Sequence, residues 1–182
     1  MRAVDVAIGL CWIIFWVFWL LAATQSKPGQ GRWTRCAGIR VAVVILVVAL
    51  VHGVGFRWHS VNSDPVLSGV GLALFVLGLA LAVWARLYIG ANWGTPMSRK
   101  EQPELVTTGP YRRVRHPIYS GIILALLGTA LAVSLYYLIA FAVLAAYFVY
   151  SATREESYLA GQFPDAYPGY KRSTKMLIPF VF

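Results

Sequence analysis

Residues 105–121 carry the sequence LVTTGPYRRVRHPIYSG, in which a dense cluster of positive charge comes directly before a long apolar run. Three arginines and a histidine fall within five positions, namely Arg112, Arg113, Arg115 and His116. Residues 107–110 have the composition of a turn, because glycine is free to adopt a positive φ and proline fixes the φ that follows. Pro117 suits the first turn of a helix, where the N–H group that proline lacks would have no partner. The stretch therefore predicts a basic connection into a helix that begins near residue 117.

The rest of the chain is mostly apolar. Of its 182 residues, 59% are hydrophobic and 13% are charged, which is unlike a soluble globular domain. Apolar runs of about 20 residues are typical of membrane spans. Five can be drawn, at about 4–23, 37–54, 66–89, 118–133 and 135–151. We therefore expect an all-α integral membrane protein with about five transmembrane helices, in which the fourth span is short and forms a tight hairpin with the fifth.

The positive charge predicts how the chain crosses the membrane. A net charge of +9 can indicate nucleic-acid binding, but here the cations lie in short segments between apolar runs, so no nucleic-acid partner is expected. We expect the N-terminus outside and the C-terminus in the cytosol, because 14 of the 16 cations then lie inside and only Arg2 and Arg57 lie outside. The first run resembles a signal peptide, but its length and the cations Lys27, Arg32 and Arg35 after it favour a retained span.

Two inner segments, 90–117 and 153–180, are too polar to lie in lipid. They hold all four glutamates, His116 and four tyrosines, so we expect any chemistry to lie there. Cys11 and Cys36 form neither a disulfide framework nor a metal site by their spacing, and no metal is expected.

The basic stretch admits two interpretations. Guanidinium groups near a helix N-terminus suit carboxylates and phosphates, but they also anchor a span against anionic lipid. For Arg112 and Arg113 both interpretations stay open. An anchor needs neither an imidazole nor a phenol, so the group formed by Arg115, His116 and Tyr119 favours a ligand site.

Glu155 and Glu156 follow the fifth span directly, which predicts that its helix continues into the cytosol. Carboxylates near a helix C-terminus oppose the macrodipole, and a cationic partner would offset this. From composition alone, the simpler expectation is a solvated face paired with Arg154 or the basic tail.

Four further residues of the third span and its inner end have structural interpretations. Gly71 and Gly78, together with Gly69, would allow a close approach of helices. Arg86 lies near the inner end of this span, where it is able to extend its guanidinium to the interface or to act beside the site.

Several elements recur in a fixed order: LVT-x-GPY, RHP-x-Y-x-G, EE-x-x-L, and a tail with Tyr167 and Tyr170 three positions apart. In this order, over residues of about 92–180, the chain resembles the isoprenylcysteine carboxyl methyltransferase family, and the related membrane phospholipid N-methyltransferases share much of the pattern. The resemblance implies a single membrane domain, 1–182, with three spans in 1–89 and a cofactor-binding catalytic half in 90–182. It also implies S-adenosylmethionine as cofactor. The cofactor would lie in a cytosolic pocket formed by the hairpin of the fourth and fifth spans and by the C-terminal segment.

The resemblance further implies a set of cofactor-binding residues. The nucleoside side would be lined by Leu105, Val106, Gly109 and Tyr111. The fourth span would contribute His116, Pro117 and Tyr119, while Glu155 and Glu156 would face the amino, ribose or sulfonium groups. Tyr167 and Tyr170 would help to close the pocket. The chain departs from the family pattern at Pro103-Glu104, where a histidine is common, and at Phe163-Pro164, where FG is common.

The expected reaction is methyl transfer to a lipophilic or prenyl-type acceptor at the cytosolic membrane interface, which mainly requires in-line positioning. A carboxylate acceptor needs an orienting cation, for which Arg115 and Arg154 are candidates. A lipid amine or a small thiol needs a base, for which His116 and Glu155 are candidates. We expect a prenylated carboxylate first, with N- or S-methylation as the alternatives. Two other classes remain, an NADPH-dependent sterol-type reductase, which has more spans, and a non-enzymatic membrane scaffold.

Overall fold

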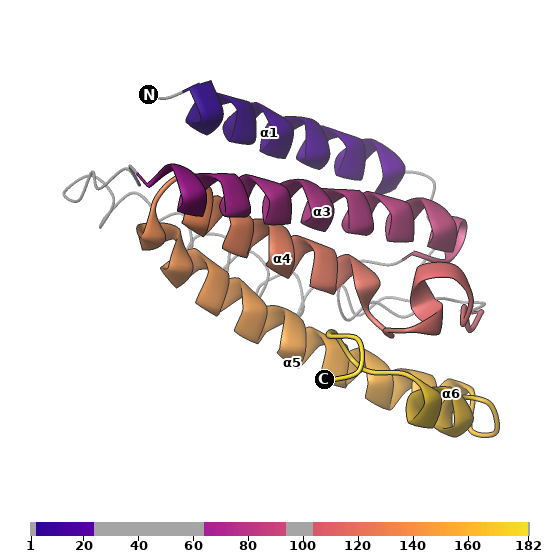
Figure 1. Cartoon of the computed structure of the whole chain (residues 1–182). Coiled ribbons are helices and arrows are strands. Elements are labelled where there is room, and N and C mark those ends of the chain that lie inside the picture. Colours follow the sequence, from indigo (N-terminus) through magenta and orange to yellow (C-terminus); the bar gives the residue numbers. More distant parts are fainter. Residues whose placement is uncertain (1–2, 24–63, 94–103, 182) are drawn as a thin grey trace.

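The computed structural model describes residues 3–23, 64–93 and 104–181, and the regular structure within these ranges is helical apart from one isolated β-bridge. Its α-helices are α1 (Ala3–Ala23), α3 (Pro65–Ile89), α4 (Pro117–Ala132), α5 (Leu138–Gln162) and α6 (Tyr167–Ser173) (Figure 1). Three short 3-10 helices are η1 (Gly90–Asn92), η2 (Gly109–Arg112) and η3 (Leu135–Tyr137). The expected span at 37–54 lies outside the described residues.

Four of the expected apolar helices are confirmed. Within the described ranges, α1, α3 and α5 are long and apolar enough to cross a membrane, whereas α4 is a shorter apolar helix of 16 residues. Pro117 is the first residue of α4, as its place in the sequence predicts. The helix of the fifth span continues past residue 151 to Gln162, so both glutamates lie on α5.

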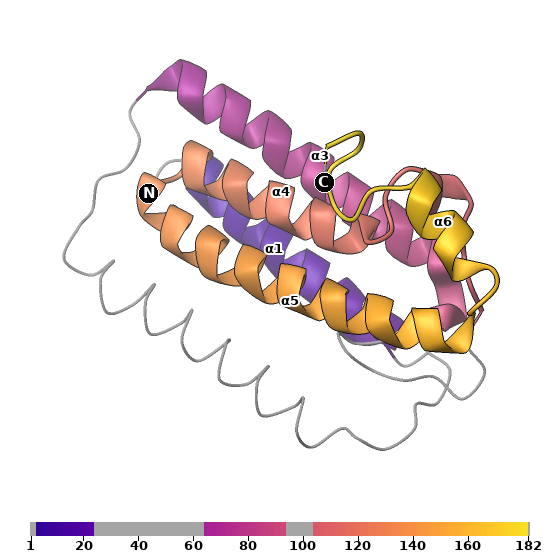
Figure 2. The ribbon, with the colours of Figure 1, turned by 90° about the horizontal axis from the view of Figure 1, so that it is seen from below.

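The four long helices lie alongside one another, and α6 crosses one end of the bundle (Figures 1 and 2). At this end α1 and α3 finish, α4 begins and α5 finishes, so the segments that connect and follow them gather in one place. The fold thus brings residues 86–93, 104–119 and 154–177 together, although they are far apart in the sequence.

Glycines fix the distance between α3 and α4. A Cβ atom at Gly78 would lie 2.4 Å from the backbone nitrogen of Ala125, and one at Gly128 would lie 2.3 Å from the backbone nitrogen of Phe75. The two helices therefore pack backbone against backbone, as small residues permit in membranes. The expectation of close approach is confirmed for Gly71 and Gly78, but a Cβ at Gly69 would meet nothing within 4 Å.

Arg86 joins the ends of two helices instead of extending to the interface. Its side chain is 3% exposed, and its guanidinium donates to the backbone oxygens of Gly90, at 2.9 Å, and Ala22. It also lies 4.6 Å from the ring centre of Trp93, which meets Trp19 of α1 edge-on. Carbonyl groups at helix ends need donors, and a buried arginine supplies several at once. These contacts hold Trp93 at the end of the bundle.

Candidate active site

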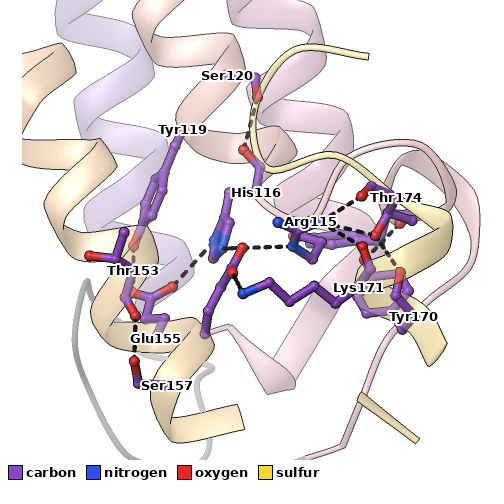
Figure 3. Close-up of polar contacts among 12 residues, drawn as sticks. Arg115, His116, Tyr119, Ser120, Thr153, Glu155, Ser157, Tyr170, Lys171 and Thr174 are labelled. Carbon is purple, nitrogen blue, oxygen red and sulfur yellow. Dashed lines mark hydrogen bonds and ion pairs between the residues drawn. The ribbon is translucent and has the colours of Figure 1, made fainter. Parts of the chain in front are cut away.

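Backbone hydrogen bonds join the C-terminal segment to the basic stretch. The backbone N–H groups of Arg115 and His116 donate to the carbonyl oxygens of Lys175, at 2.8 Å, and Met176, at 3.1 Å. Lys175 donates back to the Arg113 carbonyl at 3.2 Å, which makes the isolated parallel bridge between Val114 and Lys175. The hydroxyl of Ser120 donates to the Leu177 carbonyl at 2.6 Å and lies 3.1 Å from the His116 carbonyl (Figure 3). This pairing holds α6 across the end of the bundle.

A cavity of about 150 Å³ opens where these segments meet. Nine residues predicted from the sequence line it, namely Leu105, Val106, Tyr111, Arg115, His116, Tyr119, Glu155, Tyr167 and Tyr170. The cavity therefore draws on the connection after α3, the start of α4, the end of α5 and α6. Its position at the end of the bundle places polar groups next to apolar helices.

Four predicted residues do not line this cavity. Gly109 has a φ of 58°, and a Cβ there would lie 2.5 Å from the Tyr88 ring, so it shapes the turn behind the wall. Pro117 is fully buried at the start of α4, and Arg154 is exposed on α5. Glu156 is buried but faces other side chains.

Glu156 joins three elements through ion pairs. Its Oε1 lies 2.6 Å from Arg115 Nε and its Oε2 lies 2.8 Å from Lys171 Nζ, while the side chain is 4% exposed. Arg115 Nη1 also donates to the carbonyl oxygen of Thr174 at 2.6 Å (Figure 3). The pairing with the basic tail is as expected, but the side chain is buried and not solvated. Two cations thus offset the unfavourable position of this carboxylate near the end of α5.

A second polar group, formed by His116, Tyr119 and Glu155, lies on the cavity wall and is called the carboxylate cluster below. The Tyr119 hydroxyl donates to Glu155 Oε1 at 2.5 Å, and His116 Nδ1 lies 3.6 Å from Glu155 Oε2 (Figure 3). The rings of His116 and Tyr119 are stacked, with centres 5.4 Å apart and planes 3° apart. Because His116 Nε2 lies 3.6 Å from Glu156 Oε1, the imidazole stands between two carboxylates.

Three tyrosines of the cavity are held as neutral hydrogen-bonding groups. Burial raises the pKa of Tyr111, Tyr167 and Tyr170 above the ordinary value of a phenol, since it disfavours the charged form. The Tyr170 hydroxyl donates to the Tyr111 carbonyl at 2.7 Å, and the Tyr111 hydroxyl donates to the Ala85 carbonyl at 3.3 Å. These bonds tie α6 and η2 to the end of α3 and fix one side of the cavity.

Three buried polar atoms on the lining residues have no hydrogen-bond partner within the described parts of the chain. They are Asn92 Oδ1, His116 Nε2 and Tyr167 Oη. Buried polar groups are rarely left without a partner in folded proteins. With the carboxylates of Glu104 and Glu155 also on the wall, the cavity fits a polar ligand that carries positive charge and hydrogen-bond donors. No group of three or more His, Cys, Asp or Glu residues that could hold a metal occurs among the described residues.

Sequence reasoning missed part of the cavity wall. The missed lining residues are Ile89, Asn92, Trp93, Glu104, Ile118, Tyr158 and Leu159. Glu104 had a visible signal, because it falls where the chain departs from the family pattern. Asn92 and Trp93 carried no such signal in the sequence, since their position on the cavity wall depends on how α3 ends.

The chain is similar to proteins of known families. A family model described as phospholipid methyltransferase matches residues 67–166. The chain is 33% identical to protein-S-isoprenylcysteine O-methyltransferase B of Arabidopsis thaliana, over 78% of this chain and 71% of that protein. It is 32% identical to protein-S-isoprenylcysteine O-methyltransferase of Schizosaccharomyces pombe, over 60% of this chain and 48% of that protein.

A third relative, whose name refers to metal resistance, has a similar sequence identity to the chain. The chain is 32% identical to nickel-cobalt-cadmium resistance protein NccN of Alcaligenes xylosoxydans xylosoxydans, over 77% of this chain. The match spans 62% of that relative, so the chain corresponds to about three fifths of its length. The family match contains the cavity residues from Ile89 to Leu159, while Tyr167 and Tyr170 follow directly after it.

Proposed function

Because the chain belongs to the phospholipid methyltransferase family, we propose that it transfers a methyl group from S-adenosylmethionine to a lipophilic acceptor in the cavity at the end of the bundle. One observation carries this proposal: the cavity combines carboxylates and buried polar atoms without partners with an apolar wall at the end of apolar helices. A charged, water-soluble donor and a membrane-dissolved acceptor are able to meet at such a position.

The residues on the wall divide into two chemical sets. Trp93, Leu105 and Val106 offer an apolar surface for the purine, and the carboxylate cluster offers negative charge to a cation. When bound, the cofactor supplies a methyl group on a sulfonium cation, and its transfer leaves a neutral thioether. Tyr119 orients the Glu155 carboxylate by its hydrogen bond, so this charge is preorganised before the ligand arrives.

For the acceptor we propose a prenyl-type carboxylate, supported by the relatives named protein-S-isoprenylcysteine O-methyltransferase. Its carboxylate would be oriented by Arg115, a cation on the wall that Glu156 and the Thr174 carbonyl hold in place. Arg154 is exposed and away from the lining, so we assign it no part in orienting the acceptor. Ile118 and Leu159 extend the apolar wall for the prenyl group.

A second candidate, methylation of a lipid amine or a thiol, rests on His116. Its Nε2 has no hydrogen-bond partner among the described residues, and its Nδ1 lies 3.6 Å from Glu155 Oε2. An imidazole held in this way by a carboxylate is suited to accept a proton from a nucleophile.

We propose that the cavity faces the cytosol, with the N-terminus outside. In the part of the chain that the structure describes, every lysine and arginine belongs to the segments at the cavity end of the bundle. The positive-inside rule then supports this orientation.

The reaction is tested by incubating the detergent-solubilised protein with methyl-labelled S-adenosylmethionine and three acceptors in turn: N-acetyl-S-farnesylcysteine, phosphatidylethanolamine and a small thiol. We expect label to enter the farnesylcysteine as a methyl ester, which base releases as methanol. Base-stable label in the amine or thiol would favour the second candidate. If folded protein labels none of the three and oxidises NADPH with a sterol instead, the methyltransferase proposal is wrong.

A further inference from the structure

Outside the carboxylate cluster, a second polar pair lines the cavity. Asn92 is the last residue of η1, directly after α3, and Glu104 precedes the apolar pair Leu105 and Val106. The Asn92 side-chain amide donates to Glu104 Oε2 at 2.9 Å, and both side chains belong to the lining. The pair thus brings together an amide and a carboxylate from segments 12 positions apart.

The atoms of this pair that would bind a ligand are hydrogen-bond acceptors. Asn92 uses its amide N–H on Glu104, and its Oδ1 atom is buried with no hydrogen-bond partner within the described residues. A carboxylate accepts several hydrogen bonds at once, so Glu104 is able to take a ligand donor in addition to the Asn92 amide. Two acceptor groups therefore lie side by side on the wall, and a matching ligand presents two neighbouring donors.

A ribose carries such a pair in its 2′- and 3′-hydroxyl groups. A carboxylate that accepts from a ribose hydroxyl is a common feature of nucleotide sites in other folds. The neighbouring wall, made by Trp93, Leu105 and Val106, is apolar and suits the attached base.

An ammonium group also presents several donors, but it is less well placed here. The carboxylate cluster already offers the cationic groups of an adenosyl ligand a carboxylate, that of Glu155, which Tyr119 orients on the cavity wall. We propose that Glu104 and Asn92 bind the ribose diol of the adenosyl ligand. This rests on the proposed function, because it takes S-adenosylmethionine as the donor.

The test compares two ligands on two proteins by calorimetric titration. S-adenosylhomocysteine and its 2′-deoxy analogue are titrated into the detergent-solubilised wild type and into Glu104→Gln. A hydrogen bond to a charged group predicts that removing the 2′-hydroxyl weakens binding to the wild type by about tenfold or more. The Glu104→Gln variant should lose a similar factor for S-adenosylhomocysteine and should bind both ligands almost equally.

Asp165→Asn is the matched control, since it makes the same change from carboxylate to amide at an exposed position outside the lining. It should bind S-adenosylhomocysteine as the wild type does. If wild type and Glu104→Gln show the same loss with the 2′-deoxy ligand, this inference is wrong while the proposed function stands. If the wild type binds no S-adenosylhomocysteine, the proposed function fails and the inference fails with it.

A third ligand separates the diol from the ammonium. 5′-Methylthioadenosine keeps the ribose and lacks the amino-acid group. We expect Glu104→Gln to weaken its binding by the same factor as for S-adenosylhomocysteine. Unchanged binding of this ligand to the variant would overturn the diol assignment in favour of the ammonium.

Discussion

Glu155→Gln is expected to lower the rate of methyl transfer by about a hundredfold or more, as is typical when one preorganised electrostatic contact is removed from an active site. The substitution keeps the shape of the side chain and its ability to accept from Tyr119. It removes the negative charge next to His116, whose Nδ1 lies 3.6 Å from Glu155 Oε2. The initial rate with methyl-labelled S-adenosylmethionine and the best acceptor measures the effect.

Two further variants identify the source of this loss. Ser157→Ala lies two positions along α5, is exposed, and loses only a hydroxyl that donates to the Thr153 carbonyl, so it should keep the wild-type rate. Tyr119→Phe removes the donor that orients Glu155 and should cost about tenfold, as expected for one hydrogen bond to a charged group. A Glu155→Gln protein with wild-type thermal stability and a rate within threefold of wild type would contradict the role of this carboxylate.

Gly78→Ala is expected to destabilise the protein by about 3 kcal/mol, the upper part of the usual range for overpacking. The added methyl would lie 2.4 Å from the Ala125 nitrogen and 2.6 Å from the Gly121 oxygen. Both atoms belong to the backbone of α4, so relief requires the two helices to separate. Thermal unfolding in one detergent is monitored as the loss of the monodisperse peak. The transition temperature should be several degrees below that of the wild type.

Gly69→Ala supplies the matched control on the same helix. Nothing lies within 4 Å of a Cβ at this position, so the substitution adds only the better helix propensity of alanine, worth up to about 1 kcal/mol. Its transition temperature should be unchanged or raised. Equal stability of the two variants would show that the close packing of α3 on α4 does not hold in the membrane protein as purified.

The apolar runs predicted the long helices well, because a bilayer-length run of apolar residues has few alternatives to a helix. α6 was not predicted as a helix. It is only seven residues long, and it is held by tertiary contacts such as the hydrogen bond from Tyr170 to the Tyr111 carbonyl. Periodicity carries little information over so short a segment.

Within the site, the motifs predicted which residues gather but not how each one is used. Glu155 and Glu156 are neighbours in the sequence, yet α5 directs the first to the cavity and the second to Arg115 and Lys171. Successive residues on a helix point in different directions, so the motif alone could not separate their roles. Asn92 reaches the cavity because η1 turns the chain after α3; Gly90, with a φ of 54°, marks the end of α3 but does not predict where Asn92 lies.

The central claim is that an adenosyl ligand binds in the cavity between the start of α4, the end of α5 and α6. Calorimetric titration of S-adenosylhomocysteine into the solubilised wild type and into His116→Ala tests it most directly, with thermal unfolding as a check that both proteins are folded. The account predicts binding to the wild type, and affinity at least tenfold weaker in the variant, because His116 lies on the cavity wall between two carboxylates. Folded wild type that binds no ligand at millimolar concentration, or a variant that binds as tightly as wild type, would contradict it.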